Sequence, residues 1–183
     1  MGFYEVIEER QSIKSFNTQG PIEKDKLNRM INAAMMAPSW KNNTSYKIIL
    51  VDDKKLKDTI ADTVLNDDGQ VSRGIKDAPL LAVFVAAPDK SGELDGKEYY
   101  LVDGAIAMEH FVLAATAEGY STCWVGAANE ADVLNIIGAP KNYKLVGMTP
   151  VGHSNEQKNH NPKKDYNDYV FLNRWDNSFV KNF

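Results

Sequence analysis

Two cations and a hydroxyl lie close together near the start of the sequence, in the segment RQSIKSF. Arg10, Ser12 and Lys14 could point their donors into one small volume, because residues at i and i+4 share a face in a helical or tightly turned backbone. Clustered cationic and hydroxyl donors are what a phosphate group binds. The segment therefore indicates an anion site, and the alternative is a solvated helix end whose surface charges bind nothing specific.

Three further segments have features that suit ligand binding. Residues 37–51 are a loop marked by Pro38 that runs directly into an expected strand, and loops at strand ends often position ligand groups. Residues 119–127 place a helix stop before a short strand that ends at Gly126, where a flat ligand could approach exposed backbone. Residues 161–166 form another basic pair after a proline in an acidic protein. Each segment alone is a weak signal.

Several common catalytic patterns are absent from the sequence. It contains no G-x-G-x-x-G, no G-x-x-x-x-G-K and no G-x-S-x-G motif. His110, His153 and His160 are far apart and have no companions at metal-ligand intervals. Cys123 lies in an apolar stretch and is expected to be a buried, inert thiol. If the protein is an enzyme, a bound organic cofactor is expected to supply the difficult chemistry.

The composition is that of an ordinary globular domain. The chain has 183 residues, of which 43% are hydrophobic and 25% charged, enough for one domain with a substantial core. A net charge of -4 argues against a surface that coats nucleic acid. No apolar run approaches the roughly 20 residues that span a bilayer, and the first residues lack the bases and apolar run of a signal peptide. The single cysteine fits a reducing compartment, so we expect a cytoplasmic protein.

The chemistry-bearing segments are separated by alternating helical and strand patterns. Such alternation indicates an α/β or α+β domain with one central sheet. The longest pattern, residues 98–119, is apolar nearly all round and predicts a core or interface helix that ends at Gly119. Strands are expected at 46–51, 78–87, 121–127 and 143–153, and further helices at 23–36, 53–65 and 129–138. No element is assigned to the regions around 65–75 and 88–98.

In this order and around these elements, the four segments resemble the nitroreductase family of FMN-dependent oxidoreductases. Its R-x-S-x-[RK]-x-F pattern is matched by residues 10–16, and its G-x-x-T-C-W-[IV]-G segment almost fully by residues 119–126. The A-P-S-x-x-N part of a longer signature is matched by residues 37–42, and a late P-x-P-R-K element is matched loosely by residues 162–164. Residues 44–46 depart from the family's Gln, Pro and Trp, so the rim of the cofactor pocket is expected to differ.

The resemblance implies a fold and an assembly. The fold is an α+β sandwich, a single domain over residues 1–183 with a central, mostly antiparallel sheet flanked by helices. FMN lies in a cleft between the two chains of a homodimer. The polar but aromatic C-terminal tail, residues 165–183, would be exchanged in the dimer and wrap the partner subunit, since such a tail needs a surface to pack on.

The resemblance also implies a role for each matched residue. Arg10 and Ser12 would hold the FMN phosphate or ribityl chain, and Lys14 would lie near the N1 and O2 edge of the ring or contribute to the phosphate site. The backbone of Val125 and Gly126 would face flavin N5, the atom that accepts hydride. The remaining contacts would come from Pro38, Ser39 and Asn42 of the partner chain and, at the phosphate end, from Lys163 or Lys164. Arg73 and Lys76 are left open between an approach to the flavin and a solvated surface.

The implied activity is transfer of two electrons, as hydride, from NADH or NADPH to nitroaromatic, quinone or related acceptors by a ping-pong mechanism. A second enzymatic alternative keeps the fold but dehalogenates iodinated tyrosines or fragments the flavin. An alternative of another class is a non-catalytic protein that stores or senses FMN. The expected partners are a second copy of the chain and a small-molecule acceptor, with no nucleic acid and no membrane.

Overall fold

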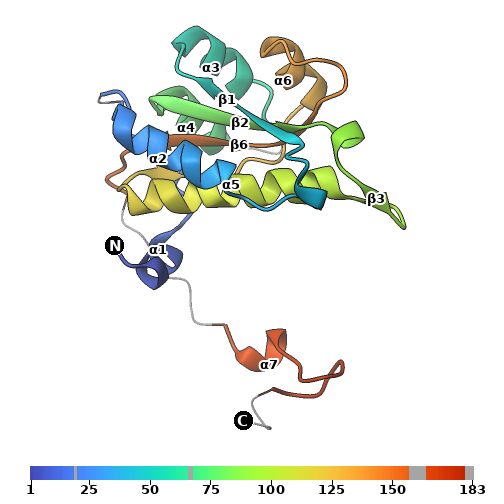
Figure 1. The fold of residues 1–183 in the computed structure, drawn as a ribbon. Helices are drawn as coiled ribbons and strands as arrows, with labels where there is room; N and C mark the ends of the chain where they lie inside the picture. The colour runs from blue at the N-terminus through green and yellow to red at the C-terminus, as the bar shows by residue number, and fades with distance from the viewer. Residues whose placement is uncertain (19, 66–67, 157–163, 180–183) are drawn as a thin grey trace.

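The central sheet lies between two layers of helices (Figure 1). The computed structural model describes residues 1–18, 20–65, 68–156 and 164–179. Strands β1 (Tyr46–Val51), β2 (Leu80–Ala86), β5 (Ser121–Thr122) and β6 (Lys144–Gly152) form the sheet. Their order is β1-β2-β6-β5, and every neighbouring pair is antiparallel. The expected α+β sandwich with a mostly antiparallel sheet is confirmed.

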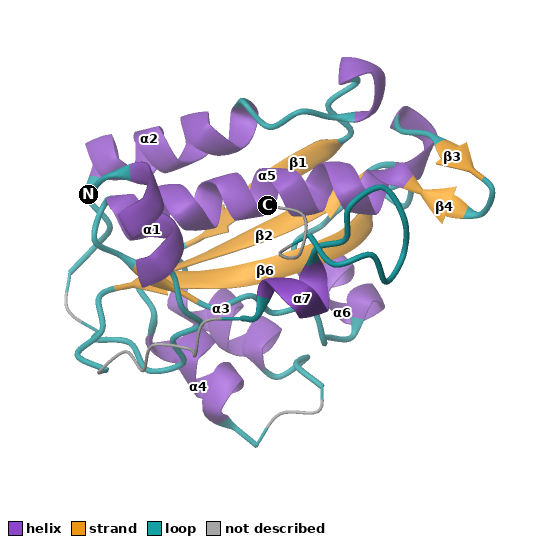
Figure 2. Cartoon of the chain, turned by 90° about the horizontal axis from the view of Figure 1, so that it is seen from below, coloured by secondary structure: helices purple, strands orange, loops and turns teal. Residues whose placement is uncertain are grey.

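Each face of the sheet has its own apolar core. Helices α2 (Lys24–Met35) and α5 (Tyr99–Ala117) cover one face, and α3 (Lys54–Ala61), α4 (Gln70–Asp77) and α6 (Glu130–Ile136) cover the other (Figures 1 and 2). Every residue of β2 is buried, and alternate residues contribute to opposite cores because side chains alternate across a strand. A continuous apolar run in the sequence therefore corresponds to a strand covered on both sides.

Helix α5 is the central helix of the α2 side. It is long and apolar enough to cross a membrane by length and composition, but the core helices of globular proteins pass the same test. Here it packs on α2 and on the sheet, and nine of its residues are buried. A Cβ on Gly104 would lie 2.5 Å from Val146 of β6, so the missing side chain allows this close approach. The prediction of a core helix over 98–119 is confirmed to within two residues at the C-terminal end.

Some element boundaries differ from those predicted. The helix expected at 53–65 ends at Ala61, and the strand expected at 121–127 ends at Thr122 because only a single bridge, from Val125 to Met148, continues the pairing. Two unassigned regions contain structure: α4 and a small hairpin of β3 (Glu93–Leu94) and β4 (Lys97–Glu98). Two short 3-10 helices, η1 (Trp40–Asn42) and η2 (Pro88–Lys90), lie in the loops that precede β1 and the hairpin.

Helix α1 (Phe3–Glu9) and the C-terminal α7 (Tyr166–Tyr169) lie on the side of α5 that faces away from the sheet (Figure 1). The tail makes local contacts, including a ring contact of 5.0 Å between Phe171 and Trp175. Trp175 is nevertheless 81% exposed. Exchange of this tail between two chains stays a prediction.

Candidate functional site

The segment that carries Arg10, Ser12 and Lys14 runs along the edge of the sheet. The Ile13 N–H donates to the Thr122 carbonyl at 2.8 Å, and Ser12 and Thr122 form a parallel bridge. Helix α1 ends at Glu9 and residues 10–14 form neither helix nor turn, so the expected helical or tightly turned geometry is wrong. The three side chains still share a face, because alternate residues of an extended strand point the same way. Ile13 is buried, whereas Ser12 and Lys14 are exposed.

Arg10, Ser12 and Lys14 all act on the Cys123 thiol. Burial raises the pKa of this thiol. The charge of Lys14, a hydrogen bond from Ser12 and the charge of Arg10 lower it, and the charge of Glu156 raises it. Cys123 is a free thiol with only 4% of its surface exposed, as expected of an inert cysteine. The structure therefore brings together the three donors predicted from RQSIKSF, although by a different backbone geometry.

A pocket of about 270 Å³ opens beside Lys14. Its wall is completed by α4, which contributes Gln70, a residue that no sequence pattern indicated, and Arg73, which the sequence left open. They are placed on one side by helical spacing, since residues three apart are neighbours on a helix surface. Of the two residues left open, Arg73 is exposed and lines the pocket, whereas Lys76 binds Asp62 at 2.6 Å. The remaining residues that line the pocket are Ser15, Asp77 and Glu156.

Helix α4 is held against the segment at residues 10–16 by close packing. A Cβ on Gly74 would lie 2.6 Å from the Lys14 carbonyl oxygen and 3.3 Å from the Phe16 ring. Real Cβ atoms essentially never come that close to backbone, so a glycine is required for this packing. The Lys14 backbone and the Arg73 side chain therefore occupy neighbouring positions that depend on Gly74.

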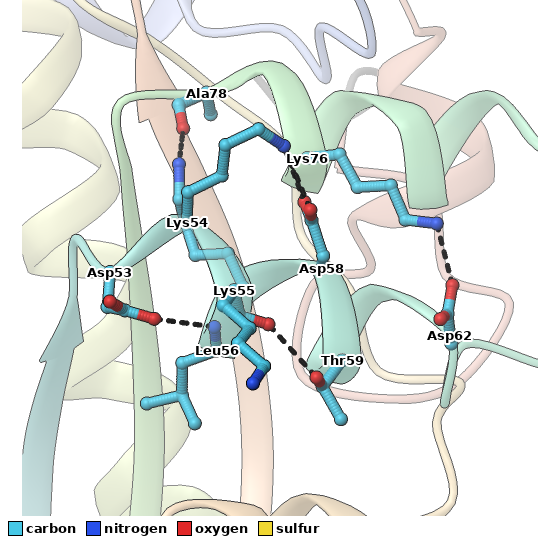
Figure 3. A network of polar contacts seen from close by, with 10 residues as sticks. Asp53, Lys54, Lys55, Leu56, Asp58, Thr59, Asp62, Lys76 and Ala78 are labelled. Carbon is cyan, nitrogen blue, oxygen red and sulfur yellow. Dashed lines mark hydrogen bonds and ion pairs between the residues drawn. The ribbon is translucent and has the colours of Figure 1, made fainter.

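Helix α3 holds α4 from the other side (Figure 3). The Lys76 ammonium is paired with Asp62, and Lys57 donates to the carbonyl of Ala78, at the C-terminal end of α4. Within α3, Lys54 and Asp58 form an i,i+4 ion pair at 2.8 Å. Surface pairs of this kind each contribute little, but the buried Lys57 fixes the end of α4 directly.

The backbone at Val125 and Gly126 offers one unused donor. The Val125 N–H donates to the Met148 carbonyl at 2.9 Å, and the Met148 N–H donates back to Val125. The Gly126 amide makes no hydrogen bond within the described parts of the chain. A Cβ on Gly126 would meet nothing within 4 Å, so the space beside it is open. Of the two amides predicted to face the ligand, Gly126 alone keeps a free donor.

Pro38, Ser39 and Asn42 lie in a loop at the other end of α5. The Ser39 hydroxyl accepts a hydrogen bond from the Thr44 N–H at 2.9 Å, which closes the loop. This loop bonds to Asp103, near the start of α5, whereas Ser12 pairs with Thr122, just beyond the helix's last turn. At 1.5 Å per residue, Asp103 and the helix's last residue, Ala117, are about 20 Å apart along the helix axis. Within one chain the loop and the segment at 10–14 therefore do not form one site.

The two lysines predicted for the phosphate end are placed only in part. Lys163 lies outside the described residues. Lys164 is exposed, and its ammonium lies 4.9 Å from the centre of the Tyr169 ring. It lines a second pocket, of about 510 Å³, with Glu8 of α1 and residues of α7. This pocket shares no lining residue with the one beside Lys14.

Comparison with known proteins gives one consistent result. The model of the nitroreductase family matches residues 7–153. A crystal structure of a nitroreductase family protein from Clostridium novyi NT is 45% identical, superimposes with a TM-score of 0.83, and is matched over 99% of this chain and 98% of that chain. The FMN reductase [NAD(P)H] of Bacillus subtilis is 28% identical over 85% of this chain and 67% of its own length.

A third relative shares the fold at lower identity. The FMN-dependent nitroreductase of Clostridium difficile R20291 is 24% identical and superimposes with a TM-score of 0.81 over 93% of this chain and 98% of that chain.

Proposed function

The chain belongs to the nitroreductase family, and from that premise we propose that it is an FMN-dependent oxidoreductase. It would move two electrons, as hydride, from NADH or NADPH to nitroaromatic, quinone or related acceptors by a ping-pong mechanism. The observation that carries the proposal is the extended segment of Arg10, Ser12 and Lys14 at the edge of the sheet, where Lys14 lines a pocket together with Arg73. The names of the relatives, an FMN reductase and an FMN-dependent nitroreductase, support the cofactor.

The residues present fit FMN. Arg10 and Ser12 offer charged and hydroxyl donors to a phosphate or ribityl chain. Lys14 and Arg73 supply positive charge at the pocket, which the carboxylates of Asp77 and Glu156 also line. The charge of Lys14 and Arg73 would stabilise negative charge that develops at the N1 and O2 edge of a flavin. When bound, FMN would supply the hydride chemistry, which no side chain of this protein can perform alone. The Gly126 amide is the donor available to orient N5, and the open space beside it admits a flat ring.

The site needs a second chain in this proposal. Pro38, Ser39 and Asn42 lie about 20 Å from the segment at 10–14 along α5. In a symmetric dimer, the loop of one subunit can complete the site of the other, because each chain contributes both surfaces. We therefore propose a homodimer with two equivalent flavin sites. The chain's only cysteine is a buried free thiol, which supports a place in the reducing cytoplasm.

The first test is the visible absorption spectrum of the purified protein, followed by identification of any small molecule released on denaturation. We expect a yellow protein that releases FMN at about one per chain, as for a resident cofactor. Oxidation of NADH and of NADPH with a quinone acceptor then tests the reaction. A colourless protein that also fails to bind added FMN would contradict the proposal. Bound FMN with only slow, non-saturating turnover would favour a flavin-storage protein instead.

A further inference from the structure

Asp103 is a buried carboxylate in the otherwise apolar helix α5, and it is fully hydrogen-bonded. Only 2% of its surface is exposed. One carboxylate oxygen accepts the backbone N–H of Trp40 at 2.7 Å, and the other accepts the hydroxyls of Ser45 at 2.7 Å and Ser91 at 2.8 Å. Burying a carboxylate is costly unless hydrogen bonds compensate, so these three donors explain how it can be buried there.

Two of the three donors come from the two ends of the same loop. Trp40 lies near the start of the loop at residues 38–44, and Ser45 directly follows its last residue. Between them Lys41, Asn42 and Thr44 have φ angles of 48°, 59° and 50°. This left-handed conformation is unfavourable for residues with a Cβ, and it persists only where the surroundings impose it. The Asp103 carboxylate restrains both ends of the loop at once, through its hydrogen bonds with Trp40 and Ser45.

Ring contacts reinforce the same arrangement. The Trp40 ring lies 4.2 Å from the Tyr99 ring, measured between centroids. It also lies against Gly92, where a Cβ would come within 2.3 Å of the indole. The start of the loop is therefore held by α5 through both a carboxylate and an aromatic contact. Ser91, the third donor, belongs to the turn that follows η2 and not to the loop.

We propose that Asp103 is a positioning residue for flavin binding: it fixes the loop at residues 38–44 in the conformation that presents Ser39 and Asn42 to FMN held by the other chain. This inference rests on the proposed function, because the loop's ligand is FMN only if that function is correct. Asp103 itself lies behind the loop and need not touch the flavin. Its effect on FMN passes through the loop backbone.

The test compares four variants of the full-length protein with the unaltered chain. Asp103→Asn removes the charge and one acceptor oxygen, and Ser45→Ala removes one loop anchor without leaving a loop donor unpaired. Ser91→Ala removes a bond to the same carboxylate outside the loop, and is the matched control. Val133 of α6 is fully buried, so Val133→Ala makes a cavity in the core and controls for a general loss of stability. For each, FMN affinity is measured by flavin fluorescence, and visible circular dichroism of the bound flavin is recorded at saturating FMN.

We expect Asp103→Asn to weaken FMN binding about tenfold, as for losing a hydrogen bond to a charged group, and Ser45→Ala to weaken it about threefold. Both should alter the visible circular dichroism of the bound flavin. Ser91→Ala and Val133→Ala should change affinity less than about twofold and leave that spectrum unchanged, even though Val133→Ala lowers the melting temperature.

Two results would overturn the inference while leaving the proposed function intact. The first is that Asp103→Asn and Ser45→Ala both bind FMN with the same affinity as the unaltered chain. The other is a loss of affinity in all four variants that follows their melting temperatures. If Asp103→Asn does not fold, the FMN affinity and flavin circular dichroism of Ser45→Ala, compared with those of Ser91→Ala, decide the question. An unaltered chain that binds no FMN would instead overturn the proposed function and this inference with it.

Discussion

Lys14 is the cation whose surroundings most directly suggest a role, because it lines the pocket with Arg73 and acts on the Cys123 thiol beside Ser12. Lys14→Met keeps the length of the side chain and removes its charge. We expect FMN to bind about tenfold more weakly, since a hydrogen bond to a charged partner contributes about 1.5–3 kcal/mol. Equilibrium titration with FMN measures this. Lys47→Met, on β1 at the opposite edge of the sheet, is the matched control and should bind as the unaltered chain does.

Lys57 leads to a prediction about pH and stability that is independent of any cofactor. Burial lowers the pKa of its ammonium group, Lys54 adds to this, and the nearby carboxylates of Asp58, Asp52 and Asp77 oppose it. The folded protein therefore releases this proton at a lower pH than the unfolded chain does. Between the two pKa values the unfolded chain binds more protons, so the free energy of unfolding rises with pH.

Urea unfolding of the unaltered chain and of Lys57→Met isolates this contribution, because all other titrating groups are common to both. The stability of the unaltered chain relative to the variant should increase as pH rises toward the usual lysine value of about 10.4, and it should be lowest near neutral pH. A difference in stability that stays constant over this range would show that the buried ammonium does not titrate as described.

Helix α4 is the element that connects the packing of the fold to the proposed cofactor pocket. A Cβ added at Gly74 meets the Lys14 carbonyl at 2.6 Å, which is backbone and cannot rotate away. Gly74→Ala should therefore cost about 1–3 kcal/mol of stability by overpacking, although alanine has the higher helix propensity. It should also weaken FMN binding, because α4 carries Arg73.

Gly126→Ala is the complementary variant. Its Cβ meets no atom within 4 Å, so the free energy of unfolding measured without FMN should change by less than about 0.5 kcal/mol, as for an ordinary surface substitution. FMN affinity should still fall, because the methyl group enters the space beside the unused amide. The opposite pattern, with a stable Gly74→Ala and a destabilised Gly126→Ala, would contradict the close packing of α4 against the Lys14 backbone.

These elements also show which parts of the structure a sequence can predict. Strand β2 and helix α5 are predictable because a long apolar run must be buried on nearly all sides, and its length separates a strand from a helix. Helix α4 escapes prediction because Gly74 lowers its helix propensity, and tertiary burial of Ile75 outweighs that cost. The sequence does not indicate the role of the Asp103 carboxylate, because its donors at Trp40, Ser45 and Ser91 come close to it only after folding.

The residues of the site are easier to predict than their geometry. Arg10, Ser12 and Lys14 do converge, but through an extended backbone held by Thr122 and not through a helical turn. The four-residue spacing of Arg10 and Lys14 is compatible with either geometry. Ser12, two residues from each, shares their face only in an extended strand, because residues two apart do not face each other on a helix. The sequence also could not show that only the Gly126 amide remains available, because the partner of Val125 is Met148 in a distant strand.

Several large apolar side chains of α1, α5 and the tail are uncovered in the single chain. Phe3 and Tyr4 of α1, Leu101 and Val102 of α5, and Trp175 of the tail are all exposed. Exposed large apolar groups that cluster on one side of a chain commonly mark an association surface. Figure 1 shows α1 and the tail on the same side of α5, so a second copy of the chain could cover the exposed groups of α1 and the tail together.

We therefore expect the full-length protein to be a dimer, and a chain that ends after Lys164 to dissociate at concentrations where the full-length dimer persists. Because the loop at 38–44 and the segment at 10–14 lie about 20 Å apart in one chain, dissociation should also release FMN. Light scattering after size exclusion gives the mass, and the flavin absorbance of the same peak gives the cofactor content. Circular dichroism must show the shortened chain folded, as expected if residues 165–179 contribute nothing to the two cores. A full-length monomer that retains FMN would contradict the two-chain site, because one chain would then hold the flavin without a partner's loop.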